Sequence, residues 1–518
     1  MGTFFRRDEK TATVETTKGK VQGYILNDIC VFKGIPYARA RRFHAPEPVE
    51  GWTDVFDACS FGFVCPLFSL PRPNGELYVP HRYWPMDEDC LNLNLWTPGC
   101  DDKKRPVMVW LHGGGYESGS AIEHIAYEGE NMSRYGDVVT VTVNHRLNIL
   151  GYLDLSDFGD EYVNSGNAGG DDIIAALKWV RDNVERFGGD PENVTVFGQS
   201  GGGGKVTTLL QSPDADGLYA KAICMSGVWE QKPPVGEEGG KALVQSLMKE
   251  LSVKRAGELE TVPYSRLAAA YEKIRPAFIR ENRYVGNQPF KNAFYAGDPL
   301  IYGFRRETEQ IPVLAGSVFG EFSSFAPGNA ERKTAGDEEQ LRLAEAFFGK
   351  EHAAALAPLF REAYPEHPLC DLVRLDHLFR PATQKYIRLR SARNACTWSY
   401  LFDHEMPIDG GTTPWHCADI PYVFHNTQFV PSTQEEGVEK LEKLIFDSVM
   451  AFARTGDPGH PGLPSWPAST PELEQTMIFD DRPFLHTNHD RELMPLFEAY
   501  MKPIFDANRE QITEKAQH

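Results

Sequence analysis

A serine flanked by glycines stands where a predicted strand meets a predicted helix. The segment reads Gly198-Gln-Ser200-Gly-Gly202, preceded by the apolar run 194–197 and followed by a helical pattern through Leu210. It matches the G-x-S-x-G nucleophile elbow, a sharp turn that lifts a serine hydroxyl above a sheet and places it at a helix N-terminus. Chance alone would produce the pentapeptide about 0.2 times in a chain this rich in glycine. A plain glycine-rich loop is therefore the alternative interpretation.

A second glycine run follows another predicted strand. The apolar segment 106–111 leads directly into His112-Gly-Gly-Gly115. Glycines at this place let the backbone approach a substrate and aim N–H groups at a developing oxyanion. A simple turn is the structural alternative. A phosphate-binding loop is excluded here because neither G-x-x-x-x-G-K-[ST] nor G-x-G-x-x-G is present.

A serine nucleophile needs a base, and the base needs a carboxylate that orients it. In the elbow-containing fold these follow in the order serine, acid, histidine, each after a later strand. Glu321 follows the predicted strand 311–315, and His416 follows the predicted strand 395–402. Position alone leaves each of them as open to an ordinary surface role as to a catalytic one.

The elements that would position these residues alternate between short apolar runs and helical patterns, which is typical of a mostly parallel sheet covered on both faces. One helix is marked by apolar residues at spacings of four, three, four and three: Ile173, Leu177, Val180, Val184 and Phe187. The predicted core strands are 106–111, 137–143, 194–197, 221–225, 311–315 and 395–402. We expect one α/β domain over 1–518, with helical insertions at about 228–310 and 329–392 that supply substrate contacts.

Composition excludes several classes of protein. Apolar residues make up 41% and charged residues 24% of the 518, as in ordinary globular proteins. Lys and Arg number 53 against 73 Asp and Glu, and a net charge of −20 disfavours nucleic acid and anionic membranes as partners. The start of the chain resembles no secretory signal, so we expect a cytoplasmic protein. Nine cysteines without a C-x-x-C pair argue against a zinc ribbon.

Nearly the whole chain resembles the type-B carboxylesterase family, which includes cholinesterases and bacterial para-nitrobenzyl esterases. The resemblance rests on ordered motifs: Phe32-Lys-Gly-Ile-Pro-Tyr-Ala38, Asp87-Glu-Asp-Cys-Leu-Asn-Leu-Asn-Leu-Trp-Thr-Pro98, Asn144-His-Arg-Leu147, Gly166-Asn-Ala-Gly169 and Phe452-Ala-Arg-Thr-Gly-Asp-Pro458. It implies an α/β-hydrolase fold, with an eight-strand-centred, mostly parallel sheet flanked by helices, and ester hydrolysis without cofactor or metal.

The resemblance also assigns roles to single residues. It implies Ser200 as nucleophile, Glu321 as acid and His416 as base. It further implies that the N–H groups of Gly114, Gly115 and Gly201 form the oxyanion hole. Tyr116, directly after these glycines, is a candidate for shaping the acyl pocket.

Three departures from the family pattern concern the site. The family elbow usually reads Gly-Glu-Ser-Ala-Gly, whereas this chain has Gln199 and Gly201. Gln199 removes a negative charge beside the serine, which weakens attraction for cationic substrates, and Gly201 keeps its N–H while loosening the turn. Cys417 stands after His416, where a small or aliphatic residue is usual. Finally, Cys65 and Cys90 match positions that are bridged in secreted relatives, and we expect both to be reduced.

The sequence therefore predicts a serine carboxylesterase for neutral short-chain alkyl or aryl esters, acting on small molecules through an acyl-enzyme. Two alternatives stay open. The same three side chains could cleave amides, carbamates or lactones, and the family also contains non-catalytic binding proteins.

Overall fold

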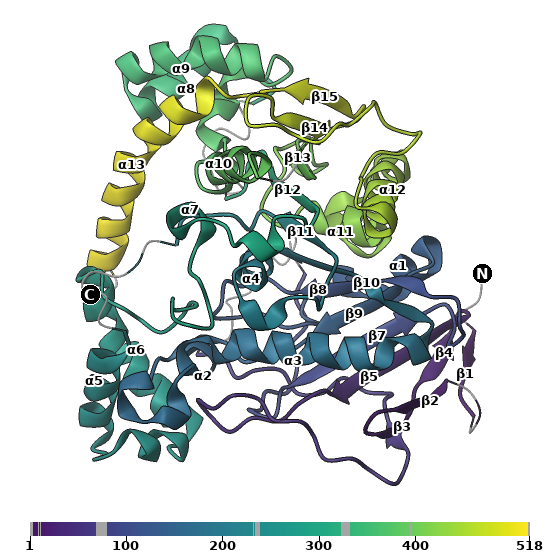
Figure 1. The fold of residues 1–518 in the computed structure, drawn as a ribbon. Coiled ribbons are helices and arrows are strands. Elements are labelled where there is room, and N and C mark those ends of the chain that lie inside the picture. Colours follow the sequence, from purple (N-terminus) through teal and green to yellow (C-terminus); the bar gives the residue numbers. More distant parts are fainter. Residues whose placement is uncertain are drawn as a thin grey trace.

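The computed structural model describes residues 4–8, 10, 12–68, 80–231, 233, 239–322, 332–393 and 396–515. Its centre is a twisted twelve-stranded sheet with helices on both faces (Figure 1). In spatial order the strands are β1 (Phe5–Arg6), β4 (Tyr24–Leu26), β5 (Ile29–Pro36), β7 (Asn92–Thr97), β9 (Val139–Val143), β8 (Arg105–Leu111), β10 (Gly189–Gln199), β11 (Lys221–Met225), β12 (Val313–Val318), β13 (Thr397–Phe402), β14 (Gln475–Phe479) and β15 (Phe484–Thr487).

From β9 to β14 all neighbouring strands run parallel, and the strands outside this range pair antiparallel. The mostly parallel sheet predicted from the sequence is therefore confirmed. The sheet is larger than the eight-stranded centre that the resemblance implies. A small second sheet forms from β2 (Thr13–Thr16), β3 (Gly19–Gln22) and β6 (Phe56–Asp57).

The helices are α1 (Gly129–Gly136), α2 (Asn148–Tyr152), α3 (Ala168–Asn183), α4 (Gly201–Leu210), α5 (Lys241–Leu251), α6 (Tyr264–Arg280), α7 (Pro299–Tyr302), α8 (Asp337–Phe348), α9 (Lys350–Ala363), α10 (Phe379–Ser391), α11 (Ile420–Phe424), α12 (Val438–Thr455) and α13 (Leu493–Lys515). The helix predicted from its apolar spacing is α3, whose last predicted turn, Val184–Phe187, is a 3-10 helix.

Strand β8 explains why both faces of the sheet are covered. Alternate side chains of a strand point to opposite faces. Val107 and Val109 pack into a core cluster that includes apolar residues of α3, whereas Met108 and Trp110 pack into a second cluster built with α11 and α12. A strand that is apolar at every position is stable only when both of its faces are buried.

Two groups of helices form apolar clusters of their own on one side of the molecule (Figure 1). Helices α5 and α6 pack together in one apolar cluster, at the lower left of Figure 1. Helices α8, α9 and α13 form another, at the upper left. Helix α10 packs against β12 and β13, and its first residue, Phe379, contacts the site described below. Within the described part of the chain, no helix is long and apolar enough to cross a membrane.

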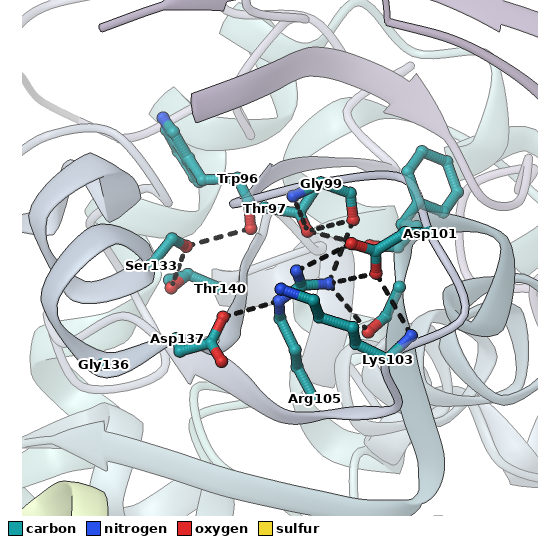
Figure 2. A network of polar contacts seen from close by, with 12 residues as sticks. Trp96, Thr97, Gly99, Asp101, Lys103, Arg105, Ser133, Gly136, Asp137 and Thr140 are labelled. Atoms are coloured by element: carbon teal, nitrogen blue, oxygen red, sulfur yellow. Dashed lines mark hydrogen bonds and ion pairs between the residues drawn. The ribbon is translucent and has the colours of Figure 1, made fainter. Parts of the chain in front are cut away.

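A polar network fixes the strands at the amino end of the sheet (Figure 2). The guanidinium of Arg105, the first residue of β8, donates two bonds to Asp101, at 2.6 and 3.0 Å, and one to Asp137, at 2.7 Å. It also donates to the carbonyl oxygen of Gly99 at 3.2 Å. Because Arg105 is buried, these charge-assisted bonds tie the turns before β8 and β9 together.

Candidate active site

Ser200 occupies a strained turn between β10 and α4. Its backbone has φ 58° and ψ −128°, a left-handed conformation that is uncommon for residues other than glycine. A Cβ atom on Gly198 would lie 2.5 Å from the carbonyl carbon of Gly202, and one on Gly202 would overlap the Leu111 carbonyl oxygen. The predicted strand–turn–helix is thus present, and its flanking glycines are required by close backbone contacts.

The second glycine run lies directly beside this turn. Gly114 and Gly115 have φ of +85° and +64°, which glycine adopts without steric penalty. A Cβ atom on Gly201 would overlap the backbone of Gly115, so the first turn of α4 packs against the glycine run with no room for a methyl group. The three residues predicted to donate N–H groups to an oxyanion are therefore close in space.

An imidazole and a carboxylate meet at the same edge of the sheet. Glu321 and His416 are 95 positions apart in the chain, and Nδ1 of His416 lies 2.5 Å from Oε2 of Glu321. The backbone N–H of His416 also donates to the Glu321 carbonyl oxygen, at 2.5 Å. The second carboxylate oxygen of Glu321 accepts from the Val318 N–H at 2.9 Å. Both carboxylate oxygens are held, which fixes the orientation of the ring through Nδ1.

The serine hydroxyl and the imidazole are not joined directly. Among the described residues, no hydrogen bond links Ser200 Oγ to His416. Instead, the side-chain nitrogen of Gln199 lies 3.3 Å from Nδ1 and 3.4 Å from Nε2 of His416. Catalytic hydrogen bonds are often long or poorly aligned before substrate binds. The structure therefore brings Glu321 and His416 together, and it places His416 against the residue that precedes Ser200.

Two phenylalanines enclose the imidazole. The ring of Phe379 stacks on His416 with 5.3 Å between centroids and 7° between planes. Phe322, which is 59% exposed, lies 4.7 Å from the same ring at 36°. The sequence reasoning missed both contacts. Phe322 could have been found because it follows Glu321, whereas Phe379 comes from α10 and carries no signal beyond an apolar helix position.

Cys417 orients the Gln199 side chain. Its thiol donates to the Gln199 side-chain oxygen at 3.2 Å, and burial raises the pKa of the thiol well above its usual value. A thiol held in the neutral form is a poor nucleophile. Cys417 has φ 79°, in the left-handed region that glycine tolerates best. Cys417 and Gln199 both depart from the family pattern, and the first donates a hydrogen bond to the second.

Two further acids lie near Glu321. Burial raises the pKa of Asp376 to about 8, and the Glu321 charge adds to the shift. Burial likewise raises the pKa of Asp419 to about 7, although a 2.8 Å bond from the Tyr400 hydroxyl opposes the rise. A raised pKa favours the neutral form of Asp376, which lessens its repulsion with Glu321. Its carboxyl group also accepts from the first backbone N–H groups of α10, those of Leu378, Phe379 and Arg380.

Tyr116 is a buried wall next to the glycine run. Its hydroxyl lies 3.2 Å from Oγ1 of Thr208 and accepts from the Gln231 side-chain nitrogen at 3.1 Å. Its ring meets that of Tyr152 edge-on, with centroids 5.2 Å apart. These contacts fix the orientation of the Tyr116 ring, and its role in shaping an acyl pocket stays a prediction.

Metal-ligating side chains gather elsewhere. Within the described ranges, one group of three could hold a metal ion: His404, Asp480 and Asp481, whose ligand atoms lie within 4.8 Å of one another. This group contains none of the residues predicted for the site. Among the described residues no disulfide bond joins any of the cysteines, and Cys65 and Cys90 are both buried.

Known proteins resemble this chain over nearly its whole length. The para-nitrobenzyl esterase of Bacillus subtilis (strain 168) is 33% identical over 502 residues, which are 92% of this chain and 97% of the relative. The phenmedipham hydrolase of Pseudarthrobacter oxydans is 30% identical, over 90% of this chain and 94% of the relative. A solved esterase from Clostridium hathewayi, described as able to hydrolyse aliphatic aromatic polyesters, is 49% identical with a TM-score of 0.93, covering 96% of this chain and 100% of that one.

These relatives are described as esterases or as a hydrolase. The model of the carboxylesterase family matches residues 10–494. Because this match covers far more than half of the 518 residues, the chain belongs to the carboxylesterase family.

Proposed function

We propose that this carboxylesterase uses Ser200 as nucleophile, His416 as general base and Glu321 as the acid that orients it. The observation that supports the proposal best is the 2.5 Å contact between Nδ1 of His416 and Glu321, beside a serine in a strained elbow. A carboxylate on Nδ1 selects the tautomer whose Nε2 can accept a proton. The family resemblance implies the same roles for these three residues.

The proposed reaction has two halves. His416 takes the proton of Ser200 as the hydroxyl oxygen attacks the ester carbonyl carbon, and the N–H groups of Gly114, Gly115 and Gly201 bind the oxyanion. His416 then protonates the leaving alcohol, which yields an acyl-enzyme. Water, deprotonated by the same imidazole, attacks the acyl group, and Ser200 leaves with the proton as the acid is released.

We further propose neutral alkyl and aryl esters as substrates. The side chain beside Ser200 is an amide, Gln199, rather than a carboxylate, so nothing on the elbow attracts a cationic leaving group. The phenylalanines at 322 and 379 give His416 an apolar surrounding. A relative at 49% identity is described as hydrolysing aliphatic aromatic polyesters, which favours aromatic acyl groups. A cytoplasmic location stays a prediction from the sequence.

We expect the protein to hydrolyse para-nitrophenyl butyrate and to prefer an ester to the amide with the same acyl group. The expected ratio of kcat/KM is at least about 100-fold, or about 2.7 kcal/mol of barrier. Paired para-nitrophenyl esters and para-nitroanilides measure it. A preference for the amide would favour the alternative hydrolase chemistry, and no turnover by well-folded protein would favour the binding protein.

Replacing Gln199 by glutamate is expected to move substrate preference toward cations. A carboxylate near the site favours a charged leaving group, so kcat/KM for butyrylcholine should rise roughly tenfold relative to its uncharged 3,3-dimethylbutyl analogue. The same carboxylate stabilises protonated His416, so activity should be lost at a higher pH than in the wild type as the pH falls. The uncharged ester is the matched control, and an unchanged ratio between the two esters would contradict the proposed role of Gln199.

A further inference from the structure

A buried lysine lies behind the glycine run. Lys205 is the first residue with a side chain in α4, after the four glycines Gly201–Gly204, and it is 1% exposed. Lysine is almost never fully buried unless its amino group has a partner. Here Nζ donates to the carbonyl oxygen of His112, at 2.8 Å.

That carbonyl belongs to the peptide that connects β8 to the glycine run. A Cβ atom on Gly202 would lie 3.0 Å from the same oxygen, so this peptide packs against the first turn of α4. On the far side of the run, the backbone N–H and the hydroxyl of Ser118 donate to the Gly114 carbonyl oxygen, at 3.0 and 3.1 Å. The glycines, which have no side chains of their own to hold them, are thus anchored at both ends.

Several titratable groups surround the buried amino group of Lys205. The acid that faces it is Glu123, and the other titratable groups around it are His112, His145 and Cys65. Burial lowers the pKa of Lys205 to about 7, which the Glu123 charge opposes, and burial raises the pKa of Glu123 to about 7. The two imidazoles stack with centroids 5.0 Å apart.

Glu123 and His112 also pack against the same glycine. A Cβ atom on Gly119 would lie 2.9 Å from Oε1 of Glu123 and 2.7 Å from Nδ1 of His112. The carboxylate that faces Lys205 therefore belongs to the segment that continues from the glycine run. Lys205 thus bonds the start of the glycine run, and Glu123 lies beside Gly119, which follows that run.

We propose that Lys205 is a positioning residue that fixes the backbone of residues 113–115 so that its N–H groups can bind the oxyanion. It touches no substrate and acts through the His112 carbonyl. The inference rests on the proposed function, because it assigns the support of the proposed oxyanion hole to this side chain.

Replacing Lys205 by methionine keeps the length of the side chain and removes the donor. We expect kcat for para-nitrophenyl butyrate, per titrated active site, to fall about 10–100-fold while KM changes less than about twofold, because the loss falls on the transition state. The inhibition constant of an aryl trifluoromethyl ketone, which binds as an oxyanion adduct, should rise in parallel. Lys205→Gln, which retains an N–H donor, should recover part of both effects.

Lys221→Met is the matched control. Lys221 is also buried and lies in β11, where its amino group bonds the Asn193 side chain away from the glycine run. Its replacement should leave kcat and ketone inhibition unchanged per active site.

The outcomes separate two failures. A Lys205→Met enzyme with wild-type kcat and ketone affinity would overturn the positioning role while leaving the proposed function intact. A variant whose activity falls only in step with its folded fraction would do the same. If wild-type protein neither turns over the ester nor binds the ketone, the proposed function itself is wrong.

Discussion

Replacing Ser200 by alanine is expected to lower kcat for para-nitrophenyl butyrate by about 10⁵–10⁶-fold and to remove labelling by an organophosphate fluoride. Without the hydroxyl there is no acyl-enzyme, and loss of a catalytic serine in such a triad removes nearly all of the rate enhancement. The side chain is partly exposed at the elbow, so the alanine variant should fold normally. Steady-state turnover and mass spectrometry of the labelled protein measure the two effects.

Ser226 provides the control for this experiment. It follows β11, the strand next to β10, and it also has a left-handed backbone, with φ 42°. Its side chain is fully buried, and among the described residues its hydroxyl has no hydrogen-bond partner. Ser226→Ala should therefore retain turnover and label. Labelling at Ser226 in the wild type, or turnover that survives Ser200→Ala, would show that Ser200 is not the nucleophile.

Replacing Gly201 by alanine is expected to lower kcat by about 10²–10³-fold, the effect of losing one oxyanion donor. The added methyl group would overlap backbone atoms of Gly115, and backbone cannot move aside as a flexible side chain can. Either the glycine run or the first turn of α4 must shift, and both carry proposed donors.

Gly170 supplies the matched glycine for that test. It lies in the first turn of α3, where a Cβ atom would meet nothing within 4 Å. Gly170→Ala should leave kcat unchanged and raise the free energy of unfolding by up to about 1 kcal/mol, since alanine is the better helix former. If Gly201→Ala has the kcat of the wild type per active site, the contact with Gly115 does not position the N–H groups that are proposed to bind the oxyanion.

The part of the fold that the sequence predicts best is the parallel centre of the sheet. Strands such as β8 and β9 carry runs of apolar or β-branched residues and are buried on both faces, which gives them a strong signal in the sequence. The strands that escaped prediction lie nearer the edges. β14 begins with Gln475 and Thr476, and β1 has two residues, so neither has the long apolar run that marks a central strand.

Some residues of the proposed site can be predicted from their neighbours in the sequence, whereas others depend on distant parts of the chain. Ser200 is predicted by its own neighbours, because the strained turn needs glycines at fixed spacing. Glu321 and His416 depend on the order of the strands together with the family resemblance. The stacking of Phe379 on His416 joins residues from separate elements, and an apolar side chain on a helix gives no sign of its partner.

Lys205 is the clearest residue that the sequence reasoning missed. A lysine in a helix normally lies at the surface, so its charged side chain predicts exposure rather than burial. The available signal was its setting in the sequence, between four glycines and the uncharged run Val206–Leu210. The structure buries every residue of that run.

The arginine at the start of β8 and the serine at the end of β10 occupy opposite rims of one sheet. The ion pairs of Arg105 and the proposed nucleophile thus lie at opposite ends of neighbouring parallel strands. In directed evolution, substitutions in the turns around Arg105 and substitutions that alter selectivity near Ser200 should therefore have largely independent effects.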